Sequence, residues 1–122
     1  MYAYNDIFIE KSPGLFLQAA YEILHLYPFA RFTVIGDGVL LESLQDLALR
    51  LEIRWAVDFV GWIGDELPNI LAGIDIVLHT FLWPETFCIS NIEVMSMGIP
   101  LITFAVGGNI FNLLIYHNTI VR

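Results

Sequence analysis

One stretch of this 122-residue sequence decides the fold: Arg31-Phe32-Thr33-Val34-Ile35, followed directly by Gly36-Asp37-Gly38. The first five residues form a short segment that is rich in β-branched side chains, which predicts a strand, and the glycines predict a loop after it. A helical pattern of apolar residues then runs from Leu40 to Leu51. The stretch therefore predicts a strand, a loop and a helix in succession.

The same succession continues downstream. Apolar runs predict further strands over residues 57–60, 74–79 and 101–104. Between them, helical patterns predict a short helix that begins near Asp65 and a longer helix that is closed by Gly98, a glycine in the position favoured just past a helix end.

Upstream, residues 2–4 predict another strand, and Ser12 and Pro13 are typical of the N-cap and first residue of a helix, which stops before Pro28. Continuously apolar strands that alternate with helices indicate a parallel sheet covered by helices on both faces. The sequence thus predicts a single α/β domain over residues 1–122, with a doubly wound parallel sheet and no linker or internal repeat.

Charge, length and cysteine content exclude several classes of protein. Thirteen acidic and five basic residues give a formal charge of −8, which argues against a protein that binds nucleic acid by neutralising phosphates. A chain of 122 residues has room for one domain, not for two complete halves that close over a cleft. The single cysteine, Cys88, cannot form an intramolecular disulfide, and residues 1–10 lack the pattern of a signal peptide, so the cellular compartment stays open.

Residues 94–121 raise the question of a membrane span, because they include no Asp, Glu, Lys or Arg. Glycine, proline and asparagine interrupt this stretch and would break a spanning helix, leaving polar groups in hydrocarbon. The interruptions are Gly98, Pro100, Gly107, Gly108, Asn109, Asn112 and Asn118. We therefore favour a folded domain over a membrane span.

Ligands of open parallel sheets bind beyond the carboxyl ends of the strands, so the loops after strands are where a site is expected. Lys11 is the only lysine, and it follows an expected strand end, which makes it a candidate partner for an anion. The alternative is a solvated charge in front of a helix. Another such loop is formed by Gly36, Asp37 and Gly38. Leu41 stands where the dinucleotide fingerprint has its third glycine, so the prediction of an NAD or FAD site loses its main support.

Two glutamates give a second signal. Glu85 precedes the expected helix and Glu93 lies on it, about two turns or 11 Å apart, so one carboxylate could address a sugar and the other a ribose. The free backbone N–H groups at the start of this helix, with the positive end of its dipole, favour anionic oxygens; they belong to Phe87, Cys88 and Ile89. The alternative is that Glu93 simply lies on the solvent side of its helix.

Other chemistries find little support in the sequence. No Cys/His spacing or paired aspartates suggest a metal site. Ser90 and Ser96 lack the G-x-S-x-G context of a hydrolase nucleophile. His79, at the end of an expected strand, could donate to a ligand, but we interpret it as a core or rim histidine.

Several segments follow one another in an order and with gaps that together match one family. They are Glu10-Lys11-Ser12-Pro13-Gly14, Val34-Ile35-Gly36-Asp37-Gly38, Val57-Asp58-Phe59-Val60-Gly61, Asp75-Ile76-Val77-Leu78, Glu85-Thr86-Phe87-Cys88, Glu93-Val94-Met95-Ser96-Met97-Gly98-Ile99-Pro100 and Val106-Gly107-Gly108. In these segments the chain resembles the nucleotide-sugar-binding, C-terminal half of the retaining glycosyltransferases of family 4, which have the GT-B fold. The match spans nearly the whole chain.

The resemblance implies a Rossmann-like domain, truncated at both ends relative to the family, that binds a nucleotide sugar such as a UDP- or GDP-sugar. No metal or other cofactor is implied. Lys11 would contact the donor diphosphate, Glu85 the sugar hydroxyls and Glu93 the ribose hydroxyls. The remaining donor-binding groups would be Gly36, Asp37, Gly38 and the backbone amides of Phe87, Cys88 and Ile89.

The resemblance also implies transfer of the sugar with retained configuration, in an enzyme whose acceptor-binding domain would pack against this one. Without that domain the chain should bind the donor and not transfer it.

Two alternatives stay open. The family usually has Gly-Arg at the positions of Asn5 and Asp6, and a carboxylate in place of a phosphate-binding cation opposes donor binding. Thr86 and Cys88 also stand where the family commonly has glycine. The chain could therefore be a non-catalytic interaction module with a decayed donor site. Another GT-B enzyme, such as a nucleotide-sugar epimerase, fits the arrangement of Glu85 and Glu93 less well.

Overall fold

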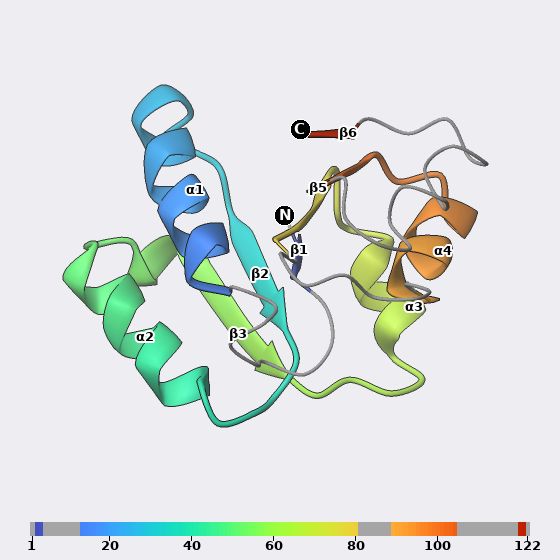
Figure 1. Cartoon of the computed structure of the whole chain (residues 1–122), viewed down its shortest axis with the longest axis horizontal. Coiled ribbons are helices and arrows are strands. Elements are labelled where there is room, and N and C mark those ends of the chain that lie inside the picture. The colour runs from blue at the N-terminus through green and yellow to red at the C-terminus, as the bar shows by residue number, and fades with distance from the viewer. Residues whose placement is uncertain (1, 4–12, 81–88, 105–119, 122) are drawn as a thin grey trace.

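A computed structural model describes residues 2–3, 13–80, 89–104 and 120–121. These residues form six strands and four α-helices that mostly alternate along the chain (Figure 1). The elements in chain order are β1 (Tyr2–Ala3), α1 (Pro13–Leu26), β2 (Phe32–Ile35), α2 (Leu41–Arg50), the 3₁₀ turn η2 (Arg54–Ala56), β3 (Val57–Gly61), α3 (Leu67–Leu71), β4 (Val77–His79), α4 (Ile89–Ser96), β5 (Leu101–Phe104) and β6 (Ile120–Val121).

All strand pairs are parallel, and the strands form two three-stranded sheets, β1-β2-β3 and β4-β5-β6. Strand β1 lies beside β4, so the spatial order across both sheets is β3-β2-β1-β4-β5-β6. This is the strand order of a doubly wound fold, in which the chain reverses its direction of winding between β1 and β4. The predicted α/β fold class is confirmed.

Helices α1 and α2 cover one face of the strands, and α3 and α4 cover the other. On one face, Phe16 and Leu17 of α1 and Leu44 of α2 pack in one core cluster with Phe32 and Val34 of β2. On the other face, a second cluster joins α3, α4, β4 and β5, and Ile35 of β2 belongs to it. Because neighbouring residues of a strand point to opposite faces, β2 contributes to both clusters. Figure 1 shows α1 and α2 together at the left and α3 and α4 together at the right.

Most predicted boundaries agree with the structure, with one clear difference. Helix α1 begins at Pro13 and ends before Pro28, and β5 covers residues 101–104 as expected. Strand β4, however, begins at Val77 and not at Ile74. The backbone N–H of Ile74 still donates to Leu71 O at 3.0 Å, in the turn that ends α3, whereas the N–H of Val77 donates to Pro100 O at 2.9 Å, just before β5. The apolar run thus begins in a turn before it becomes a strand.

Within the described parts of the chain, no helix combines the length and apolarity that a membrane span requires.

Candidate functional site

The carboxyl ends of β1 and β4 meet at the point where the winding reverses, which is where open parallel sheets form their binding crevice. The described groups near this edge are the loop after β2, the last residues of β4 and the helix α4. Four predicted site residues, Lys11, Glu85, Phe87 and Cys88, lie outside the described residues. Ile89 is the first residue of α4, so it lies at the helix start, where the sequence predicts it.

The loop after β2 contains Gly36, Asp37 and Gly38, at the carboxyl end of its strand as predicted. Gly36 has a φ of 131° and Gly38 a φ of 149°, values that side-chain-bearing residues rarely adopt. The N–H of Gly36 donates to Gly61 O at 2.9 Å, and the N–H of Gly38 donates to Asp37 Oδ1 at 2.7 Å. The exposed Asp37 side chain therefore holds its own loop, and its role toward a ligand stays a prediction.

Glu93 lies on the flank of α4 and is half-buried. Its Oε2 atom is fully buried and has no hydrogen-bond partner among the described residues. Since a buried carboxylate oxygen without donors is costly, it is unusual in a residue that serves only the fold. The alternative that Glu93 simply faces solvent is therefore not supported.

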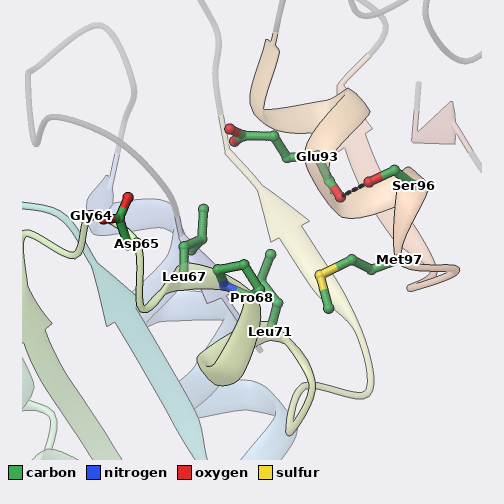
Figure 2. A pocket seen from close by; sticks show the side chains of 8 residues that line it. All are labelled: Gly64, Asp65, Leu67, Pro68, Leu71, Glu93, Ser96 and Met97. Atoms are coloured by element: carbon green, nitrogen blue, oxygen red, sulfur yellow. Dashed lines mark hydrogen bonds between the residues drawn. The ribbon is translucent and has the colours of Figure 1, made fainter.

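Glu93 lines a cavity of about 500 Å³ between α3 and α4. Its other lining residues come from the turn before α3, from α3 itself and from the end of α4, and they are Gly64, Asp65, Leu67, Pro68, Leu71, Ser96 and Met97. Figure 2 shows the Glu93 side chain extending from α4 on the side of this cavity, with the Ser96 hydroxyl donating to the Glu93 carbonyl at 2.7 Å. The cavity thus combines an apolar floor with a carboxylate that needs donors.

A pair of buried polar side chains joins β4 to α4. His79, the last residue of β4, and Asn91, in the first turn of α4, are both 0% exposed. Nδ1 of His79 and Oδ1 of Asn91 are 2.5 Å apart. His79 is thus a core histidine, as interpreted from the sequence. The sequence reasoning missed Asn91, although an asparagine three residues before Val94 on the apolar face of a helix is a detectable signal.

No group of three or more His, Cys, Asp or Glu side chains that could hold a metal ion occurs among the described residues.

Comparison with known proteins places this architecture in one family. The family model for glycosyl transferases group 1 matches residues 1–110. An uncharacterized glycosyltransferase of Methanocaldococcus jannaschii is 32% identical over 80 residues, covering 65% of this chain and 20% of that protein. A phosphatidylinositol N-acetylglucosaminyltransferase subunit from Arabidopsis thaliana is 29% identical over 99 residues, covering 80% of this chain and 22% of that protein.

Solved structures share the fold. Anabaena HepE, determined in complex with UDP, superposes with a TM-score of 0.81 at 23% identity, over 90% of this chain and 30% of that one. S. aureus TarM, also determined with UDP, gives a TM-score of 0.82 at 18% identity, over 90% of this chain and 22% of that one. The chain spans about a fifth of the length of the two curated relatives described above. By its sequence and its fold, the chain belongs to the glycosyl transferases group 1 family.

Proposed function

We propose that this chain is the donor-binding domain of a retaining glycosyltransferase of family 4 and that it binds a nucleotide sugar at the carboxyl edge of its sheet. The observation that carries the proposal is the buried Oε2 of Glu93, which has no partner among the described residues and belongs to a side chain lining the cavity between α3 and α4. Vicinal hydroxyls of a ribose are donors of the kind that this oxygen lacks.

The proposed ligand class also draws on relatives of the same fold. HepE has been determined with UDP and with UDP-glucose, both of which pair a ribose with a diphosphate. In this chain Lys11 would contact the diphosphate, together with the backbone amides of Phe87, Cys88 and Ile89, the last of which begins α4. Glu85 would hold the hydroxyls of the transferred sugar.

The chemistry of such a transfer consists largely of positioning and charge stabilisation. The bond between the anomeric carbon and the diphosphate oxygen breaks, and the diphosphate leaves with the electron pair. An acceptor hydroxyl forms the new bond to the same face of the anomeric carbon and gives its proton to the departing diphosphate oxygen. Lys11 would stabilise the negative charge that develops on the leaving group, while an acceptor-binding domain of the whole enzyme would position the hydroxyl and exclude water.

Calorimetric titration of the chain with UDP and GDP tests the proposal. We expect binding of one of them, and we expect Glu93→Gln to weaken it about tenfold, the effect of losing a charge-assisted hydrogen bond. The control is Glu42→Gln, an exposed carboxylate on α2, which should leave the affinity unchanged.

Absence of binding by the unaltered chain at millimolar UDP or GDP would favour the alternative function, a non-catalytic interaction module. The sequence feature behind that alternative is Asp6, which stands where the family usually has an arginine. Equal binding by the unaltered chain and Glu93→Gln would remove Glu93 from the proposed site while leaving donor binding in place.

A further inference from the structure

The hydrogen bond between His79 and Asn91 joins two elements at the carboxyl edge of the sheet. His79 ends β4 and Asn91 lies in the first turn of α4, so the bond connects the strand to the helix that follows it. Because Asn91 Oδ1 can only accept, His79 Nδ1 carries the proton and donates it. Both side chains are 0% exposed, so water does not compete for this bond.

The bond lies where it can fix the orientation of α4. The buried face of this helix includes Ser90, Asn91 and Val94, whereas Glu93 follows Asn91 by two residues and so lies about 200° further around the axis. A side-chain atom about 5–6 Å from the axis moves about 1 Å for every 10° of rotation. Small rotations of α4 therefore displace the Glu93 carboxylate by distances that matter for a hydrogen bond.

Apolar packing alone fixes such a rotation poorly. Val94 is 0% exposed, but a valine in an apolar pocket has no directional bond and tolerates small shifts. A buried polar pair must keep its geometry, because breaking it leaves a donor and an acceptor unsatisfied away from water. The pair thus supplies directional information that the apolar contacts of α4 do not.

We propose that His79 and Asn91 are positioning residues: their hydrogen bond sets the rotation of α4 and thereby holds Glu93 at the cavity where it meets the ligand. This inference rests on the proposed donor-binding function. It assigns a role to two residues that need not contact the ligand themselves.

Three variants of the chain test this role by calorimetric titration with UDP and GDP, under conditions in which circular dichroism shows each variant to be folded. Asn91→Leu removes the acceptor and should weaken nucleotide binding about tenfold, in the range that misplaced supporting groups produce. Asn91→Asp keeps an acceptor for His79 and should bind within about threefold of the unaltered chain. Val94→Ala, the matched control on the same buried face, should lower the melting temperature but leave the affinity unchanged.

The outcomes separate the two proposals. Binding by the unaltered chain together with equal binding by Asn91→Leu overturns the positioning role but not donor binding, as does an affinity loss of the same size in Val94→Ala. Failure of the unaltered chain to bind either nucleotide overturns both proposals. If Asn91→Leu does not fold, Asn91→Ala replaces it with the same expectation, since the smaller side chain fits the space of the asparagine.

Discussion

The two halves of the strand array bury different kinds of side chain. The half formed by β1–β3, α1 and α2 has a core cluster of hydrophobic residues alone. The half formed by β4–β6, α3 and α4 has an apolar cluster as well, but all buried polar side chains found among the described residues belong to it: His79, Thr80, Ser90, Asn91 and Thr103. Glu93, with its buried oxygen, lies in the same half.

This difference indicates that the two halves have different roles, one in stability and the other at the candidate site. Burying polar groups costs free energy unless each finds a partner, so a domain selected only for stability gains more from apolar side chains in those positions. In the first half, the buried side chains among the described residues are all apolar. In the second half polar groups gather at the carboxyl edge, where the binding crevice of this fold class lies. Substitutions in each half test this difference.

The largest effect is expected in the apolar half, from Phe16→Ala. Phe16 is 1% exposed and meets Phe32 of β2 edge to face, with ring centroids 6.3 Å apart. Removing the ring should lower the free energy of unfolding by about 3–5 kcal/mol, through lost burial and the cavity left behind. Urea denaturation followed by circular dichroism measures this value. A loss below about 1 kcal/mol would mean that the Phe16 ring is not tightly packed in this core.

The sequence predicts the fold well because its signals are local. Gly36 follows the end of β2, and Gly98 lies just beyond the end of α4. Both glycines have a positive φ, a backbone conformation that neighbouring residues do not override, so they mark these ends in the sequence. The predicted start of β4 at Ile74 is wrong, because an apolar residue occurs in a turn as well as in a strand. Only the hydrogen bond from the Ile74 N–H to Leu71 O shows that this residue lies in the turn. Apolarity alone does not reveal which partner a backbone group finds.

The candidate site was predictable only in part. Glu93 stands out in the sequence as an isolated charge in an apolar helix. In the structure it lines a cavity and has one buried oxygen, and its role toward a ligand stays a prediction. The bond between His79 and Asn91 joins residues from a strand and a helix, and pairing across elements depends on their packing. Which residues line the cavity with Glu93 depends in the same way on how α3 packs near α4, which no local pattern encodes.

In the polar half, Glu93→Leu should raise the free energy of unfolding of the ligand-free chain by about 1–2 kcal/mol. The substitution removes a buried oxygen that lacks a partner among the described residues and adds apolar contacts with a cavity floor that includes Leu67 and Leu71. Urea denaturation measures the change, and Met97→Leu, in the same cavity wall, should be close to neutral. A destabilised Glu93→Leu would show that the carboxylate serves the fold and would weaken the division between the halves.

The ends of α2 and α4 offer a matched pair of smaller effects. Both helices end in the same hydrogen-bond pattern: Ile53 N donates to Ala48 O at 3.0 Å after α2, and Ile99 N donates to Val94 O at 3.4 Å after α4. The residue that turns the chain has a φ of 59° at Glu52 and 72° at Gly98. Since only glycine adopts this conformation without strain, the half with the apolar core carries the strained turn.

Glu52→Gly should therefore stabilise the chain by about 1 kcal/mol, and Gly98→Ala should destabilise it by about the same amount. A Cβ atom at position 98 would meet nothing within 4 Å, so the cost there is conformational and not steric. Thermal melts of the two variants give the comparison. Effects of equal sign would show that the two turns are governed by their surroundings and not by backbone conformation.

The smallest effect is expected at Phe29, which is 93% exposed in the connection between α1 and β2. Phe29→Ser removes the same aromatic ring as Phe16→Ala does, thirteen residues away in the same half. The Phe29 ring, however, is almost fully exposed, so its removal changes the buried apolar area very little. The free energy of unfolding should change by less than about 0.5 kcal/mol. Phe29 also precedes β2, toward the amino ends of the parallel strands, so the affinity for UDP or GDP should stay unchanged. A loss of several kcal/mol would mean that burial does not separate these two phenylalanines, and the contrast between the halves would then need another physical basis.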